Sequence, residues 1–290
     1  MSSRRAALYS VYRLLQSMGY FALRDRMSPY ATVLTFHRVN DTEAHNGLTV
    51  HPRLFEEILD VLMRRYRIVP LARLCEMVLK SEPIPARTVA ITFDDGYLDN
   101  FSVAAPILKY KKVPATFFVS SGYVGTTRRF PWDVSDSASH PMMTWEHIRQ
   151  LATEGFEVGS HSVNHVNLGR CTPDVARKEI IESKRHIEDQ LGTAIWGFAY
   201  PFGWKKSMSE VTSRMVREAG FAYSCSNYGG KVTARSDIFN IQRTGAYPTT
   251  TEMLMEVDSF MTYYDGMMRM HVLGFDIPMG TSGEQAEDKI

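Results

Sequence analysis

The sequence is poor in the features that mark several common classes of protein. Its three cysteines lie far apart and form no CxxC pair, which argues against a disulfide framework or a cysteine-based zinc site. No apolar run is long enough to cross a bilayer. The 33 basic and 32 acidic residues nearly cancel, and they form no basic stripe of the kind that nucleic-acid binding requires. We therefore expect free thiols, a reducing compartment and no nucleic-acid partner.

The composition is that of a globular protein. The chain has 290 residues, of which 44% are hydrophobic and 22% charged, and this length is ordinary for one α/β barrel. We expect an N-terminal amphipathic helix over residues 1–29, a barrel over residues 30–265 and a C-terminal tail over residues 266–290. The tail is small, polar and charged, which is typical of a mobile terminus.

The N-terminal segment combines apolar residues at helical spacing with basic residues. It lacks the uninterrupted apolar core and the cleavage site of a signal peptide, so we expect a cytoplasmic protein. The helix either packs on the domain or lies on an anionic membrane surface, in which case residues 4–26 make a peripheral membrane contact. Its basic residues are Arg4, Arg5, Arg13, Arg24 and Arg26.

Short β-rich runs alternate with helical patterns along the chain. About seven strand–helix repeats predict an α/β fold, a distorted (β/α)7 barrel similar to a TIM barrel, in a single domain. The predicted strands are 31–36, 88–93, 115–119, 157–160, 195–200, 223–226 and 240–243. The predicted helices are 52–64, 71–79, 102–110, 145–154, 173–191, 210–219 and 251–263.

Polar residues follow these strands, where parallel barrels place their chemistry. His37, the Asp94-Asp95 pair and His161 each come directly after a predicted strand, and Arg243 ends a late one. Several segments that are far apart in the sequence are therefore expected to meet on one face.

The adjacent carboxylates of Asp94 and Asp95 repel each other, so both stay ionised near pH 7 only beside a positive charge. The spacing of His161 and His165 is typical of metal ligands on one turn. Two imidazoles and one carboxylate form a common catalytic zinc set that leaves a position open for water. The alternative is that the two acids form a helix-capping turn and that the histidines are surface residues.

Three segments resemble motifs of the NodB-type polysaccharide deacetylases, carbohydrate esterase family 4. Residues Thr92–Gly96 match the first motif, His161–His165 the second and Tyr200–Gly203 a variant of the third. The resemblance covers roughly residues 31–250. Residues Leu34–Val39 are similar to the N-terminal motif of a subgroup that deacetylates poly-N-acetylglucosamine and related exopolysaccharides.

The resemblance implies a role for each matching residue. Asp95, His161 and His165 would bind a divalent metal, with zinc as the default and cobalt, nickel or iron as alternatives. Asp94 would be the general base and His37 the general acid, although a loop histidine with structural hydrogen bonds is the other interpretation of His37.

The third motif departs from the usual family pattern. Residues 198–199, Phe-Ala, occupy the region in which an arginine normally orients the base. Arg243 is the candidate to orient Asp94 instead, against the alternative of an ordinary ion pair. The resemblance implies that the backbone N–H of Phe202 stabilises an oxyanion, whereas the alternative is a simple turn. Three further aromatic residues are candidates for stacking on a sugar: Trp132, Tyr200 and Trp204.

Together these expectations describe a metal-dependent hydrolase that removes N-acetyl groups from an N-acetylated saccharide, an exopolysaccharide or glycan precursor, and releases acetate. One alternative is an O-acetyl esterase with the same machinery. A second is a non-catalytic carbohydrate-binding barrel, against which the complete set of acids and histidines argues. A third is an amidohydrolase that acts on a non-sugar amide.

Overall fold

The computed structural model describes residues 3–42, 47–134, 138–245 and 248–260. The predicted tail over residues 266–290 and the end of the helix predicted over 251–263 lie outside these ranges. The chain divides into a larger compact unit, Ala22–Thr250, and a smaller one that combines Met1–Phe21 with the segment from Thr251 onward. The boundaries expected after residues 29 and 265 stay predictions.

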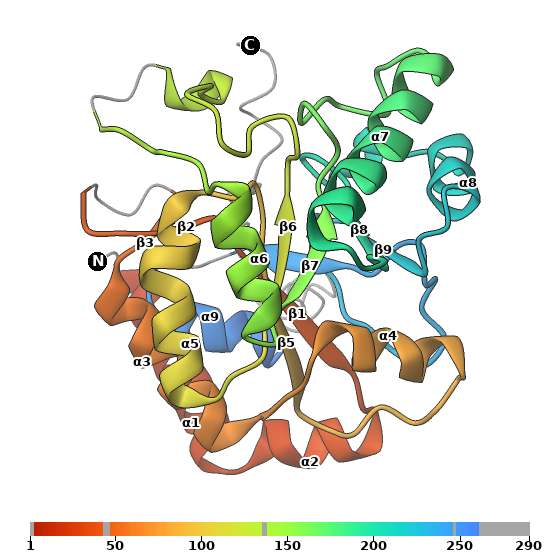
Figure 1. Cartoon of the computed structure of the whole chain (residues 1–290). Coiled ribbons are helices and arrows are strands. Elements are labelled where there is room, and N and C mark those ends of the chain that lie inside the picture. The colour runs from red at the N-terminus through yellow and green to blue at the C-terminus, as the bar shows by residue number, and fades with distance from the viewer. Residues whose placement is uncertain (1–2, 43–46, 135–137, 246–247, 261–290) are drawn as a thin grey trace. The chain divides into compact units, whose positions relative to one another are not determined.

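The larger unit is built around a parallel sheet (Figure 1). Within the described residues, seven strands follow one another in the order β10-β1-β5-β6-β7-β8-β9. A parallel bridge between Cys225 and Ile241 joins the last strand to the segment that leads into β10. The sheet therefore nearly closes on itself, and the predicted (β/α)7 barrel is confirmed. The strands are β1 (Ala31–Phe36), β5 (Thr88–Phe93), β6 (Thr116–Val119), β7 (Glu157–Ser160), β8 (Gly197–Ala199), β9 (Tyr223–Cys225) and β10 (Arg243–Gly245).

The central strands are buried along their whole length. Every residue of β1, β5 and β6 is buried, as expected for a parallel sheet with both faces covered. In the parallel register Phe36 pairs with Phe93, and the ring of Phe93 also stacks on that of Phe117 at 4.9 Å. This aromatic layer supports the carboxyl ends of the strands, at which the polar residues emerge.

Short strands that the sequence did not predict complete the β-structure. Strand β4 (Arg67–Ile68) pairs with the start of β5. Strands β2 (Arg38–Val39) and β3 (Thr49–Val50) form a separate two-stranded sheet. The late strand was expected over residues 240–243 but begins at Arg243, so the expectation that Arg243 ends a strand is wrong.

Helices cover the outside of the strands of this unit (Figure 1). Thr144 and Ser209 each begin a helix with a reciprocal capping box. Thr172, also expected as a cap, makes no such side-chain bond. A π-helical turn, η1 (Asn100–Ala104), precedes the helix predicted over 102–110. The helices are α3 (Pro52–Arg65), α4 (Leu71–Leu79), α5 (Ala105–Lys111), α6 (Trp145–Thr153), α7 (Pro173–Leu191) and α8 (Glu210–Glu218), with short turns η2 (Pro131–Asp133) and η3 (Lys205–Ser207).

The smaller unit contains α1 (Ser3–Ser17) and α9 (Thr250–Val257), and α2 (Tyr20–Met27) spans its boundary. The buried Tyr12 donates its hydroxyl to the Asp258 carboxylate at 2.6 Å, and its ring lies 5.3 Å from that of Phe260. The predicted helix thus packs through Tyr12, whereas Leu14 and Met18 are exposed.

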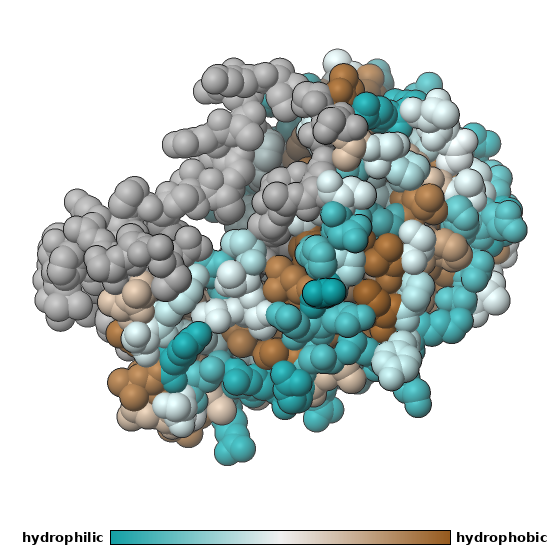
Figure 2. All heavy atoms as spheres, turned by 90° about the vertical axis from the view of Figure 1, so that its left-hand side faces the viewer, coloured by the Kyte–Doolittle hydropathy of each residue, from teal (hydrophilic) through white to brown (hydrophobic). Residues whose placement is uncertain are grey.

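The visible surface in Figure 2 is mostly hydrophilic, with apolar side chains between the polar ones. Among the described residues, no helix combines the length and the apolar character that crossing a bilayer requires.

Candidate active site

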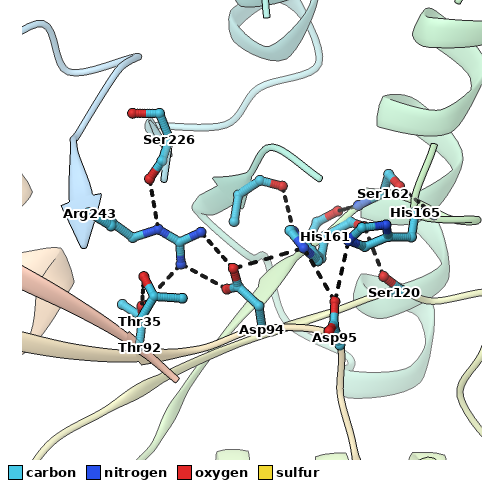
Figure 3. Close-up of polar contacts among 12 residues, drawn as sticks. Thr35, Thr92, Asp94, Asp95, Ser120, His161, Ser162, His165, Ser226 and Arg243 are labelled. Atoms are coloured by element: carbon cyan, nitrogen blue, oxygen red, sulfur yellow. Dashed lines mark hydrogen bonds and ion pairs between the residues drawn. The ribbon is translucent and has the colours of Figure 1, made fainter. Parts of the chain in front are cut away.

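The two adjacent acids follow β5 and point in different directions (Figure 3). The backbone N–H of Asp94 donates to Phe36 O of the neighbouring strand at 2.9 Å, which continues the sheet pairing. Asp95 then adopts the left-handed conformation, φ 75°, and Gly96 follows with φ 91°. This reversal separates the two carboxylates, and both are almost fully buried.

Asp94 is paired with Arg243. The guanidinium donates to both carboxylate oxygens, at 2.8 and 2.7 Å, and its Nε donates to Ser226 O at 3.1 Å. Thr92 Oγ1 accepts a further bond from Nη1 at 3.0 Å. Burial opposes ionisation of Asp94, but the charge and hydrogen bonds of Arg243, together with smaller effects of His161 and His37, outweigh it, so that the pKa of Asp94 is lowered to about 2. Arg243 thus lies where the sequence predicts, against the expected base.

Asp95 lies between the two histidines. Its Oδ1 is 3.5 Å from Nε2 of His161 and 3.4 Å from Nε2 of His165. Two ligand atoms bound to one tetrahedral zinc at about 2.0–2.1 Å lie about 3.4 Å apart. Neither carboxylate oxygen of Asp95 has a hydrogen-bond partner among the described residues. These three residues therefore fit a divalent cation, both in spacing and in the acceptor atoms that they leave unused.

The electrostatics of the three groups agree with this fit. Burial and the neighbouring charge of Asp94 raise the pKa of Asp95 well above its usual range. Burial lowers the pKa of His161 and lowers that of His165 still further, so both imidazoles are neutral and keep a lone pair. His161 Nδ1 contacts Ala199 O at 2.8 Å, which orients the ring with Nε2 toward Asp95. A bound cation would favour the ionised form of Asp95.

His37 emerges at the end of β1, beside β5. Its carbonyl oxygen accepts a hydrogen bond from Asn100 Nδ2 at 2.6 Å, which ties this residue to the π-helical turn η1. Burial lowers the pKa of His37 to about 4, although the negative charge of Asp94 opposes the change. The structure thus brings His37 close enough to Asp94 for the two side chains to interact electrostatically.

The Tyr200–Gly203 loop follows β8. Tyr200 is fully buried, and its ring packs against Phe198 at 5.3 Å, so the expectation that Tyr200 stacks on a sugar is wrong. Phe202 has a left-handed φ of 63°, and its N–H meets no acceptor among the described residues. A Cβ at Gly203 would lie 2.5 Å from Asn227 N, so only glycine allows this loop to sit so close to its neighbour.

Two half-buried aromatic side chains contact His165, and a third packs behind one of them. The ring centroid of Trp132 is 5.0 Å from that of His165, and the ring centroid of Phe202 is 4.8 Å from it. Trp204 packs on Phe202 at 5.3 Å. Of the two tryptophans expected from the sequence to contact a sugar, Trp132 therefore borders the candidate metal site, and Trp204 lies one ring further out, against Phe202.

A buried polar network holds Trp132 in place. The indole N–H donates to the Tyr97 hydroxyl at 3.0 Å, and this hydroxyl donates to Asp133 Oδ2 at 2.7 Å. Arg38 Nη1 donates to the other oxygen of Asp133 at 2.9 Å, and both charged side chains are 1% exposed. The network fixes one wall of the site.

Neither this network nor Glu179, a buried acid of α7 that accepts the backbone N–H of Val163, was expected from the sequence. Arg38 directly follows His37, and Asp133 directly follows Trp132. Because His37 and Trp132 were already candidate site residues, their neighbours could have been examined as candidates too. Glu179 carried no such signal, because it stands among other acidic residues of a long helix.

Comparisons with known proteins agree with the geometry. Residues 81–224 match the polysaccharide deacetylase family. The chain is 23% identical over 236 residues to YxkH of Bacillus subtilis, covering 81% of this chain and 76% of that protein. It is 25% identical over 173 residues to the poly-beta-1,6-N-acetyl-D-glucosamine N-deacetylase of Staphylococcus aureus, covering 57% of this chain and 56% of that protein. The chain thus spans about half of the staphylococcal enzyme.

Solved structures show the same fold. IcaB from Ammonifex degensii superposes with a TM-score of 0.68 at 25% identity, covering 79% of this chain and 97% of that one. The Streptococcus pyogenes deacetylase PplD in complex with acetate gives a TM-score of 0.66 at 22% identity, with 79% and 98% covered. Since the matched segment contains the acid pair and both histidines, the chain contains a polysaccharide deacetylase domain of the NodB type.

Proposed function

We propose that this protein is a metal-dependent hydrolase that removes acetyl groups from an N-acetylated saccharide and releases acetate. The observation that carries the proposal is the division of the acid pair. Asp94 is kept ionised by Arg243, whereas Asp95 faces two neutral imidazoles at 3.4–3.5 Å. One acid is thereby available as a base and the other as a metal ligand.

Asp95, His161 and His165 would hold the divalent ion. When bound, such an ion lowers the pKa of a water and polarises an acyl oxygen. Two imidazoles and one carboxylate suit zinc, and also cobalt, nickel or iron. The Oδ2 atom of Asp94 lies 3.9 Å from His161 Nε2, beside the three ligands.

Asp94 begins the reaction as the general base. The water oxygen attacks the acyl carbon and forms the new C–O bond, and its proton passes to the Asp94 carboxylate. Arg243 keeps that carboxylate charged and fixed in orientation, which is the requirement for a positioned base. The N–H of Phe202, which has no acceptor among the described residues, donates to the developing oxyanion. One such donor stabilises a transition state by about 3 kcal/mol.

His37 completes the reaction as the general acid. Its pKa of about 4 makes it neutral near pH 7 before substrate reacts. Negative charge on the attacked acyl oxygen raises this pKa and favours transfer of the proton from Asp94 to His37. The imidazolium then gives that proton to the amine nitrogen as the C–N bond breaks, and acetate and the free amine leave.

The aromatic side chains support a saccharide as the substrate. Trp132 and Phe202 are half-buried and border His165, and the half-buried Trp204 packs on Phe202. Aromatic faces pack well against the apolar faces of sugar rings. The S. aureus relative is named for poly-beta-1,6-N-acetyl-D-glucosamine. We therefore place the substrate among exopolysaccharides or glycan precursors that contain N-acetylated sugars.

The low pKa of His37 favours one second candidate, an esterase for O-acetyl groups. An alcohol leaving group needs less protonation than an amine, so a neutral histidine hinders ester cleavage less than amide cleavage. The metal ligands and the base would serve both reactions.

A screen for acetate release over N-acetyl and O-acetyl saccharides, with and without chelator, tests the proposal. We expect release from an N-acetylated saccharide that stops on chelation and returns when zinc is added. Release that is indifferent to a chelator, in protein shown to be free of metal, would contradict the metal-dependent mechanism. Release from O-acetyl substrates alone would favour the esterase.

We also propose that α1 contacts a membrane surface. Val11 and Leu14 expose apolar side chains on this helix, and Met18 does so directly after its end. Arg13 adds positive charge, a combination typical of interfacial helices. Replacing Leu14 and Met18 by Glu should abolish sedimentation with vesicles that contain anionic lipid, while Tyr12 keeps the packing of the helix. Unchanged sedimentation of the double variant, or no sedimentation of the wild type, would contradict this contact.

A further inference from the structure

The loop between the two candidate histidine ligands has an unusual backbone. Ser162 and His165 both adopt left-handed conformations, with φ of 61° and 54°, which side chains other than glycine disfavour. Such conformations persist only where the surrounding structure holds them. The loop therefore depends on contacts from outside itself.

Glu179 of α7 provides the principal contacts. Its Oε2 accepts the backbone N–H groups of both Val163 and Asn164, at 2.9 and 2.7 Å. Its Oε1 accepts Asn164 Nδ2 at 2.7 Å. The carboxylate is buried, so a single side chain from a helix caps two consecutive amides between the ligands. Charge-assisted bonds of this kind are stronger than those between neutral groups.

The two histidines depend on the loop to different degrees. The ring of His161 is oriented by Ala199 O, which belongs to β8. The Nδ1 atom of His165 has no hydrogen-bond partner among the described residues. The direction of the His165 ring is therefore set by its backbone and by the aromatic rings around it. The His165 N–H donates to Ser162 Oγ at 3.0 Å, and Glu179 holds the two residues that precede His165.

We propose that Glu179 is a positioning residue of the metal site. It keeps the strained His161–His165 loop in the conformation that turns His165 Nε2 toward Asp95. This inference rests on the proposed metal-dependent function, and it adds a buried acid from α7 that touches neither the ion nor the substrate. Outer partners of metal ligands commonly change metal affinity by about 10- to 100-fold when they are removed.

The first test is the zinc affinity of Glu179→Ala, measured by competition with a chromophoric chelator. We expect a loss of about 10- to 100-fold relative to the wild type. Glu182→Ala is the matched control, because Glu182 lies on the same helix, is 36% exposed and, within the described part of the chain, forms an ion pair with Lys178 alone, at 4.0 Å. Equal affinities of wild type, Glu179→Ala and the control, within twofold, would overturn the proposal.

A second pair of variants separates the hydrogen bonds from general damage to the fold. Glu179→Gln keeps the volume but sets an amide N–H₂ against Asn164 Nδ2, so two donors face each other and zinc affinity should fall. Adding Asn164→Asp reverses the partners, because the new carboxylate accepts from Gln and still accepts from Arg128 Nη1, which bonds Asn164 Oδ1 at 2.8 Å in the wild type. The double variant should regain most of the affinity. A double variant no better than Glu179→Gln would refute the specific contact.

Hydrogen exchange of the metal-free protein distinguishes this inference from the proposed function. The amides of Val163 and Asn164 should exchange at least about tenfold faster in Glu179→Ala, which removes their shared acceptor, than in the wild type. A wild type that binds no zinc would refute the proposed function, and exchange would still decide whether Glu179 holds the loop. Unchanged exchange in the variant would overturn the positioning role even if zinc binds.

Discussion

Arg243 donates one hydrogen bond to each oxygen of Asp94, although 149 residues separate them in the sequence. Both side chains are almost completely buried. A buried pair of this kind is not by itself evidence of stability, since desolvation offsets much of the attraction. Its effect here is to fix the charge and direction of one carboxylate while the adjacent Asp95 is left for a different partner.

The first prediction concerns Asp94→Asn. The amide cannot take a proton from water, so acetate release should fall by about 10²–10⁴-fold, the contribution of a positioned base. Zinc affinity should change little, because Asp95 and the two histidines are intact. Activity comes from an acetate assay and metal content from elemental analysis. Retained activity in a zinc-loaded variant would refute the role of Asp94.

The second prediction concerns stability against pH in the metal-free protein. The pKa of Asp94 is 3.8 ordinarily and about 2 in the fold, so its stabilising effect is present above pH 4 and is lost as pH falls toward 2. We compare the free energy of unfolding of the wild type with that of Asp94→Asn. The difference between the two proteins should be about 2 kcal/mol larger at pH 5 than at pH 2. Urea titrations measure the difference. A difference between the wild type and Asp94→Asn that does not change with pH would contradict the pairing.

The third prediction separates amide from ester substrates. In His37→Ala, cleavage of an N-acetyl saccharide should fall by about 10²-fold or more, because the amine leaves poorly without a proton. Cleavage of an O-acetyl ester should fall less than about tenfold, since an alcohol needs less help. Comparison of kcat/KM for the two substrates checks this. Equal losses on both substrates would show that His37 acts in another way, for example by shaping the loop after β1.

The fourth prediction concerns the wall of the site. Tyr97→Phe removes the hydroxyl that links Trp132 to Asp133. The indole N–H of Trp132 then loses its acceptor, and Asp133 Oδ2 loses its donor. The free energy of unfolding should fall by about 1–3 kcal/mol, and KM for a saccharide should rise while zinc affinity stays constant. Tyr110→Phe, at a residue that is 87% exposed, is the matched control. A rise in KM equal to that of the control would show that Trp132 does not need this anchor.

Much of the fold could be predicted because most strands and helices show one clear pattern of apolar and polar residues. The strands Ala31–Phe36, Thr88–Phe93 and Glu157–Ser160 have the predicted bounds, since apolar runs there end at polar residues or glycine. The late strand was misplaced by three residues, because the run before Arg243 is short and mixed in character. Its register is set by pairing with β1, which no local pattern reveals.

The sequence predicted those site residues that lie within recognisable motifs. The positions of Asp95, His161 and His165 could be expected to converge because parallel strands present their carboxyl ends together. The burial of Tyr200 could not be expected, because it depends on the direction in which a loop residue turns. Glu179 was equally hidden, since nothing local distinguishes an acid that faces a loop from one that faces solvent.

The backbone conformations around the site have a consequence for engineering and for evolution. Of the eight non-glycine residues with positive φ in the described part of the chain, four are Asp95, Ser162, His165 and Phe202. A programme that raises thermal stability by relieving unfavourable dihedrals would select these positions first, for instance by introducing glycine. Such substitutions would raise stability but would loosen the backbone that preorganises the catalytic centre. Thermostable descendants of this protein should therefore accumulate their changes elsewhere in the barrel.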